Sequence, residues 1–351
     1  MTRRVPAAAP ALLALAALAG AGVLADGPSE RAARAPRSQP LDIAPDFAPV
    51  LSAGTLRLFT RTGRNQLLAW SGEEPPQCSP VPIETAVQPV ACAGAVFALD
   101  ESGALWKLGG GFPRTVDQLP PGALALLAGE PLPAVLYADF LRLPGGGRAP
   151  LPFPALGGCP VAAGWWVYGE ARAALLRGDG TAAWTWAPQG LHPRLACVSG
   201  DRCFAGTAEG LLVALDAATG APRFQYRCGG EVVRPLPLPG GGVLFTSFDH
   251  SVRRLTRAGQ LLWQARLGGR LSFGALLVPG GVLAAEQAGR RVALFDLERG
   301  KLLWRWDAPE GEILLAPAAQ GATAAVLVSS GRREPTLWLL PLPEPREAGR
   351  G

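Results

Sequence analysis

The stretch GLLVALDAATGAPRF at residues 210–224 joins an alternating apolar run to an aspartate, a Thr-Gly turn and an aromatic residue. Related stretches follow it at a fixed distance. The apolar runs that end at Leu215, Leu255 and Phe295 are 40 residues apart, and each is followed by a turn glycine and an aromatic residue. A period of this length is typical of proteins built from repeated supersecondary units.

Weaker copies of the run extend the repeat in both directions. They end at Trp70, Leu108, Leu143, Leu176 and Leu340, which gives eight copies in all. Each copy is preceded, across a tight turn, by a second short alternating run such as AVFAL or VLFTS. Alternation on both sides of a turn predicts a β-hairpin in every unit.

Each unit also has a strand before its hairpin and a strand after it. The segments PVLSAG (49–54), PVACAG (89–94) and PVAAG (160–164) are close copies of the first strand, and the aromatic residue marks the fourth. Four short strands in about 40 residues are typical of a propeller blade. We therefore predict an all-β fold, an eight-bladed β-propeller of four-stranded antiparallel blades. Seven blades are the alternative, because two units are short.

The two ends of the chain predict how the propeller closes. From Leu340 the chain reads LPLPEPREAGRG, which is too rich in proline for a fourth strand. The segment LDIAPDF (41–47) precedes the first unit, and we expect it to supply the missing strand and remove the open sheet edges. The propeller is then a single domain at 41–343, with a flexible lead-in at 26–40 and a disordered tail at 344–351.

The first 25 residues have the pattern of an export signal. Arg3 and Arg4 precede an Ala/Leu-rich stretch, and small residues at Val23 and Ala25 favour cleavage after Ala25. The alternative is an uncleaved anchor helix, although the stretch is only weakly apolar. No cysteine follows it to carry a bacterial lipoprotein's lipid. We expect a periplasmic or otherwise exported protein that is not inserted in a membrane after cleavage.

The charge of the chain bears on its partners, and its cysteines bear on disulfide bonds. The formal charge of +5 falls to +3 without Arg3 and Arg4, and the basic residues do not cluster, so nucleic acid is not an expected partner. Six cysteines in an exported chain favour disulfides, and Cys197 with Cys203 form the best local pair across a predicted hairpin. The remaining connectivity stays open, as does the alternative that all six are small buried residues.

The repeat G-x-L-x-A-L-D-x-x-T-G-x-x-x-W/F resembles the PQQ-like, or quinoprotein-type, propeller repeat. The resemblance is sharpest over residues 200–306. Among exported proteins of this length, the sequence is most similar to the BamB family of outer-membrane assembly scaffolds. This resemblance implies a non-enzymatic scaffold with protein partners in the cell envelope, although members of that family typically carry a lipid. Asp216, Asp296 and the repeated tryptophans are expected to be structural.

Enzymatic readings find little support in the residues. Quinone-dependent dehydrogenases share the repeat, and that resemblance implies a quinone, Ca²⁺, an Asp base and often an adjacent pair of cysteines. This chain has no Cys-Cys pair and no evident set of oxygen ligands for calcium. Its two histidines, His192 and His250, lack metal-ligand spacing. We expect no catalytic, cofactor-binding or metal-binding residues. A ligand- or polysaccharide-binding propeller is the other alternative.

The remaining candidate is a protein-binding surface. In a propeller, the turn inside each hairpin and the link between blades lie on one face, which we call the hairpin-turn face. We expect a monomer that binds its partner with this face through ion pairs and hydrogen bonds. The candidate residues are Arg64, Asn65, Asp139, Phe140, Glu170, Arg172, Glu209, Asp249, His250, Arg290, Arg291, Arg332 and Arg333.

Overall fold

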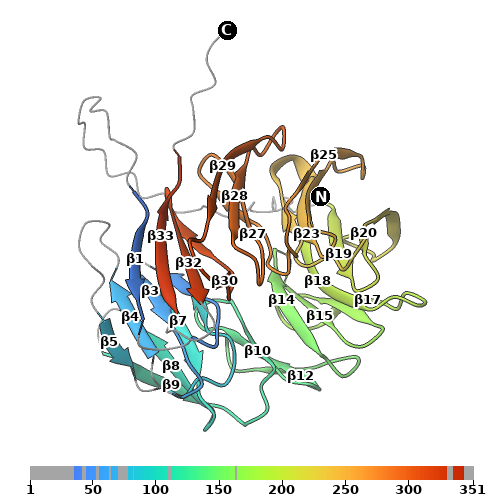
Figure 1. The fold of residues 1–351 in the computed structure, drawn as a ribbon. Coiled ribbons are helices and arrows are strands. Elements are labelled where there is room, and N and C mark those ends of the chain that lie inside the picture. Colours follow the sequence, from blue (N-terminus) through green and yellow to red (C-terminus); the bar gives the residue numbers. More distant parts are fainter. Residues whose placement is uncertain are drawn as a thin grey trace, which may run out of the picture. The chain divides into compact units, whose positions relative to one another are not determined.

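Short antiparallel strands account for nearly all the regular structure in the computed structural model (Figure 1). The structure describes residues 35–343 except 42–44, 53–54, 63–64, 70–77, 82, 110–111, 163 and 330–334. The predicted signal peptide, the start of the lead-in and the tail at 344–351 lie outside these residues. A single 3-10 turn, η1 (Pro239–Gly241), is the one helical element in the described part. The all-β prediction is confirmed.

Each described sheet of four strands is a propeller blade whose strands are consecutive in the chain. Blade 1 contains β2 (Val50–Ser52), β3 (Thr55–Leu58), β4 (Asn65–Ala69) and β5 (Cys78–Val81); blade 2 contains β6 (Val90–Cys92), β7 (Ala95–Leu99), β8 (Ala104–Leu108) and β9 (Arg114–Gln118); and blade 3 contains β10 (Ala125–Leu127), β11 (Ala134–Leu136), β12 (Phe140–Arg142) and β13 (Arg148–Pro150). Blade 4 contains β14 (Gly157–Val161), β15 (Gly164–Tyr168), β16 (Ala173–Leu176) and β17 (Ala182–Trp186), and blade 5 contains β18 (Pro193–Ser199), β19 (Arg202–Thr207), β20 (Leu211–Asp216) and β21 (Pro222–Arg227). Blade 6 contains β22 (Leu236–Pro237), β23 (Val243–Ser247), β24 (Ser251–Leu255) and β25 (Leu261–Arg266), and blade 7 contains β26 (Leu276–Val278), β27 (Gly281–Ala285), β28 (Arg291–Phe295) and β29 (Leu302–Asp307).

The described strands thus form seven four-stranded blades, the alternative count, and the prediction of eight such blades is wrong. The remaining sheet joins the two ends of the propeller and has five strands: β1 (Arg37–Pro40), β30 (Glu312–Ile313), β31 (Ala318–Gln320), β32 (Thr323–Ser329) and β33 (Thr336–Pro341). We call it the closing sheet. It departs from the expected four strands because two short segments, β30 and β31, both pair with β32.

An N-terminal strand closes the propeller, as predicted, but from a different segment. β1 pairs with β33, with Arg37 opposite Leu339, and Figure 1 shows the blue β1 beside the red β33. The closing strand is therefore 37–40, within the predicted lead-in, and not 41–47. Arg37 and Ser38 are exposed, so this outer strand needs no apolar alternation. Leu41, just beyond it, is buried and donates its N–H to the Pro335 carbonyl.

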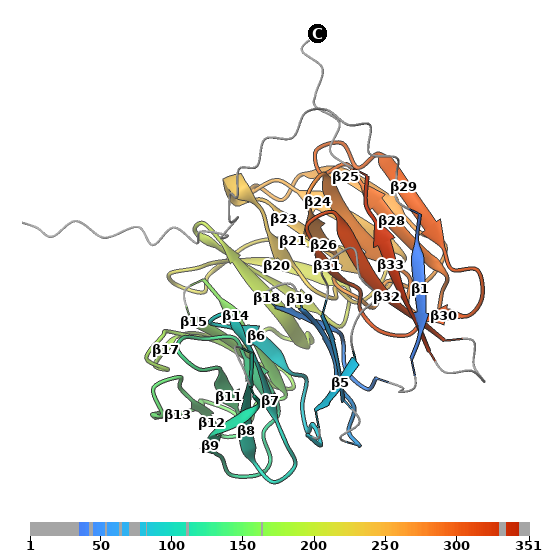
Figure 2. The ribbon, with the colours of Figure 1, turned by 90° about the vertical axis from the view of Figure 1, so that its left-hand side faces the viewer.

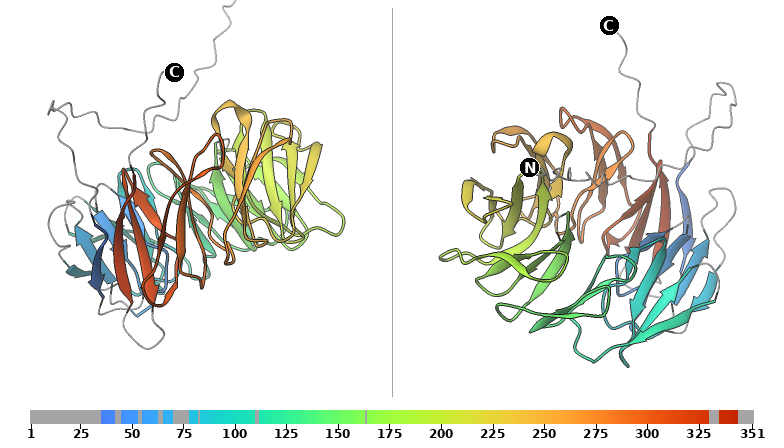
Figure 3. Two further views of the ribbon diagram at one scale, coloured as in Figure 1. Left: turned by 45° about the horizontal axis from the view of Figure 1, so that its top comes forward. Right: turned by 180° about the vertical axis from the view of Figure 1, so that it is seen from behind.

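Packing between neighbouring sheets builds the core. β7, β23 and β27 are buried along their whole length, which explains why their sequences are continuously apolar. Leu244 and Val252 of blade 6 pack against Val282 and Ala284 of blade 7. The first strand of a blade is its inner strand, and β10, β14 and β18 each contact the first strand of the next blade. The fourth strand is the outer strand. Figures 2 and 3 show the sheets side by side in chain order.

Candidate functional site

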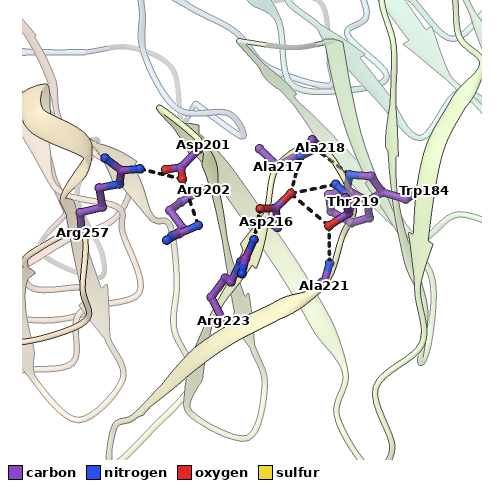
Figure 4. Close-up of polar contacts among 10 residues, drawn as sticks. All are labelled: Trp184, Asp201, Arg202, Asp216, Ala217, Ala218, Thr219, Ala221, Arg223 and Arg257. Atoms are coloured by element: carbon purple, nitrogen blue, oxygen red, sulfur yellow. Dashed lines mark hydrogen bonds and ion pairs between the residues drawn. The ribbon is translucent and has the colours of Figure 1, made fainter.

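The aspartate of the best-preserved repeat is held by its own turn (Figure 4). Asp216 ends β20, and its carboxylate accepts hydrogen bonds from the N–H groups of Ala218 at 3.1 Å and Thr219 at 3.0 Å. It also forms an ion pair with Arg223 at 2.6 Å. The hydrogen bonds from Arg223 and Thr219 lower the pKa of Asp216 to about 2. These contacts give the carboxylate a structural role, in keeping with the prediction.

The aromatic residue of each repeat contacts the following blade. Trp184 of β17 donates its indole N–H to the Ala217 carbonyl of blade 5 at 2.9 Å, as drawn in Figure 4. Gly220 lies beneath the ring with a φ of +73°, and a Cβ atom there would come within 2.6 Å of Trp184. This turn therefore requires glycine for both its conformation and its contact.

The same contact recurs two blades further on. Trp263 of β25 donates to the Leu297 carbonyl of blade 7 at 2.8 Å, and a Cβ atom on Gly300 would come within 2.5 Å of its ring. Phe224 takes the equivalent place over Gly259. These aromatic residues therefore connect successive blades.

Besides the Asp216–Arg223 pair within blade 5, an ionic contact near these repeat turns links blade 5 to blade 6. The Asp201 carboxylate lies 3.1 Å from Arg202 and 2.7 Å from Arg257, which belongs to blade 6 (Figure 4). The hydrogen bond from Arg257 lowers the pKa of Asp201. Nothing in the spacing of residues 201 and 257 signals this contact, so the sequence did not predict it.

Several residues of the predicted hairpin-turn face hold the links between blades. Glu209 accepts a hydrogen bond from the His192 N–H at 3.0 Å and contacts the His192 ring at 2.5 Å. Arg290 donates to the Ala308 carbonyl at 2.9 Å, and His250 Nδ1 lies 3.0 Å from the Gly268 carbonyl. These side chains are engaged by the fold, which limits what they offer to a partner.

Asp249 is the most strongly engaged residue of this set. Its carboxylate and the Arg253 guanidinium form a two-point pair at 3.0 and 2.5 Å, and the two side chains are only 12% and 6% exposed. Ser251 and the Gly229 N–H also donate to it. Burial opposes ionisation, but these hydrogen bonds outweigh it and hold the pKa of Asp249 well below its usual range.

The remaining residues predicted for the hairpin-turn face differ in their contacts and in their exposure. The Phe140 ring is stacked on Tyr137 at 4.2 Å and covered by the Arg148 guanidinium at 3.8 Å, so both of its faces are occupied. Arg291 pairs with Asp307 at 2.9 Å. Asp139, Glu170 and Arg172 are exposed, and Asn65 begins β4. Arg64, Arg332 and Arg333 lie outside the described residues.

The predicted Cys197–Cys203 disulfide is wrong, because the two thiols are free. Cys197 lies opposite Phe204 and Cys203 lies opposite Val198 in the β18–β19 hairpin. Neighbouring positions on a strand face opposite sides of the sheet. Cys203 accordingly packs in the core between blades 4 and 5, and Cys197 packs in the core between blades 5 and 6.

We expect four of the cysteine thiols to be unreactive in the folded protein. Burial raises the pKa of Cys159, Cys197 and Cys203, and raises that of Cys228 to about 11. Because the thiolate is the reactive form, iodoacetamide should label the four slowly at neutral pH and rapidly after denaturation. Mass spectrometry of non-reduced peptides checks this, and a peptide linked through Cys197 and Cys203 would contradict it.

The described residues contain neither a cluster of metal ligands nor a membrane-spanning helix. No group of three or more His, Cys, Asp or Glu side chains within them is arranged to hold a metal ion. No helix among them is long and apolar enough to cross a membrane.

The repeat matches a known family model. Residues 169–305 and 248–338 match the model described as outer membrane protein assembly factor BamB, which is built of PQQ-like repeats. Over these residues the chain is similar to the PQQ-like repeat propellers of the BamB family. The matched residues run from the middle of blade 4 into the closing sheet of this BamB-like propeller, and they include the repeats that sequence analysis found sharpest.

Solved structures support the fold. The computationally designed protein Ika8 matches with a TM-score of 0.68 and 14% identity, over 84% of this chain and 96% of Ika8. The propeller domain of Cps50 (Swd1) from Myceliophteria thermophila matches with a TM-score of 0.52 and 14% identity, over 74% of this chain and 97% of that one. BamB from Moraxella catarrhalis matches at 16% identity over 84% of this chain and 85% of that one, with a TM-score of 0.45. The fold comparison therefore rests on Ika8 and Cps50. No curated protein matches the sequence significantly.

Proposed function

We propose that this BamB-like propeller is a non-enzymatic, exported scaffold that binds protein partners in the cell envelope and takes part in outer-membrane protein assembly. The observation that carries the proposal is the match of residues 169–338 to the family model of an outer membrane protein assembly factor. The predicted export signal agrees with an envelope location.

The contacts of the repeat residues support a scaffold. The Asp216 carboxylate accepts hydrogen bonds from its own turn and from Arg223 of the following strand, and Trp184 and Trp263 form contacts between blades. A quinone-dependent dehydrogenase, the competing enzymatic function, would need carboxylates that are available to calcium and substrate. A polysaccharide-binding propeller would need several exposed aromatic rings. Phe112 is the one aromatic residue among the exposed large hydrophobic side chains of the described residues, and both faces of Phe140 are covered.

Capture from the cell envelope tests the proposal. The full chain with an affinity tag is produced in its own cells, cross-linked, purified from the envelope fraction and analysed by mass spectrometry. We expect outer-membrane barrel-assembly proteins to be enriched over a control propeller of unrelated sequence. Capture of polysaccharide alone would contradict the proposal, and so would oxidation of alcohols or sugars by the purified protein after addition of the quinone and Ca²⁺.

A further inference from the structure

The outer strands of the propeller differ in how their free edges are protected. Proline, charge and short length normally prevent an edge strand from pairing with another chain. Four of the outer strands contain a proline: β1, β5, β13 and β21. β25 and β29 have six residues each and contain none. These two edges therefore lack the proline that four of the other six outer strands contain.

The same two strands expose apolar side chains. Of the nine exposed large hydrophobic side chains in the described part of the chain, four lie on β25 and β29. They are Leu261, Leu262, Leu302 and Leu303, each 44 to 51% exposed, at equivalent positions of neighbouring blades. An apolar patch on a long edge strand is a surface that a further strand would cover.

The backbone of β25 is oriented to accept such a strand. The Leu267 N–H donates to the His250 carbonyl of blade 6 at 2.9 Å, and Ala265 and Trp263 lie directly opposite β24 residues in the same register. Leu262 lies at a β-bulge, where the pairing with β24 shifts by one residue. Beyond the bulge, N–H and C=O groups alternate in direction along the strand, so those of Gln264 and Arg266 point away from β24. The free edge therefore offers a regular row of donors and acceptors.

Charge distinguishes β25 from β29. Arg266 is the only charged residue of β25, and this exposed side chain has no ion pair among the described residues. On β29, Asp307 already pairs with Arg291 and Arg305. The β25 edge is thus apolar at one end and positive at the other. Its complement is an extended segment with apolar residues and a carboxylate.

We propose that the outer edge of β25 binds an extended segment of a partner protein as an additional antiparallel strand, with apolar residues against Leu262 and a carboxylate against Arg266. This inference rests on the proposed scaffold function and names its binding mode. Main-chain hydrogen bonds supply affinity in such complexes, and the alternate side chains supply specificity. A second copy is a poorer occupant, because β25 contributes no carboxylate that could meet Arg266.

A peptide probe tests the site on the full-length protein. The probe is a fluorescent peptide of alternating valine and threonine with a glutamate at its N-terminal end, and its affinity is measured by anisotropy. Gln264→Pro removes one outward N–H without breaking a bond to β24, and Arg266→Glu reverses the charge. We expect each variant to weaken binding by at least about tenfold. Gln225→Pro, at the equivalent place on β21, is the control and should bind like the wild type.

Hydrogen exchange and envelope capture complete the test. Peptide binding should slow amide exchange in the segment that contains Leu262, Gln264 and Arg266. Unchanged affinity of the Gln264→Pro variant, with an unchanged thermal midpoint, would overturn the inference, and so would a dimer of the wild type that this substitution dissociates. If Gln264→Pro captures the same envelope proteins as the wild type, the strand site is wrong and the scaffold function stands. If the wild type captures none, the scaffold function itself fails.

Discussion

Replacing Arg253 with methionine should lower the free energy of unfolding by about 3–5 kcal/mol, because it leaves the Asp249 carboxylate buried without its cation. Methionine retains most of the apolar stem of arginine, so the loss reports on the ion pair more than on packing. Urea unfolding followed by tryptophan fluorescence measures it. Arg223→Met, which removes a half-exposed guanidinium from Asp216, is the control and should leave the unfolding midpoint much closer to that of the wild type. An equal midpoint for Arg253→Met would contradict the structural role of the pair.

The loss should also depend on pH. Folding lowers the pKa of Asp249, so its stabilising contribution is complete above the pKa of an unfolded aspartate, about 4. That contribution declines as the pH falls from there toward the folded pKa. We therefore expect the difference between the wild type and Arg253→Met to be largest near neutral pH and to shrink in acid. A difference that grows in acid would contradict this linkage.

Replacing Trp263 with alanine should lower the free energy of unfolding by about 3–5 kcal/mol, because a large buried side chain between blades 6 and 7 is lost. Trp263→Phe keeps a ring over Gly300 but removes the hydrogen bond to Leu297, and should lose about 1 kcal/mol from that bond, besides any change in packing. Urea unfolding of both variants measures the two effects separately.

Leu262→Ala provides the matched control for Trp263→Ala. Leu262 is adjacent on β25 but half-exposed, so its truncation removes little buried surface and should change stability far less. Comparable losses for the two alanine variants would show that Trp263 does not fasten the blades as described.

The hairpins of the propeller were predictable because alternating apolar runs are a direct signal of buried strands. The run that opens the best repeat became β20, which is buried up to Asp216. The closing strand lacked this signal, since Arg37 and Ser38 face solvent and their place is set by pairing with β33. Backbone pairing of an exposed outer strand leaves no periodic pattern in the sequence.

The polar contacts were predictable only where they are local. Asp216 was expected to serve its own turn, and it does. Asp249 was expected to face a partner, and its burial with Arg253 was missed, although an arginine inside an apolar hairpin run is a sign of such a pair. The prediction of a disulfide between Cys197 and Cys203 failed for another reason. A shift of one residue in register moves a side chain to the other face of the sheet.

Site-specific photo-cross-linking in the producing cells tests the central claim, a protein-binding scaffold, most directly. A photoreactive amino acid is placed at Leu262 on β25 and, as a control, at Gln225 on β21. We predict that Leu262 yields a cross-link to a different envelope polypeptide and that Gln225 does not yield the same product. Cross-links from Leu262 that join only two copies of this chain, or an absence of protein cross-links from both positions, would contradict the account.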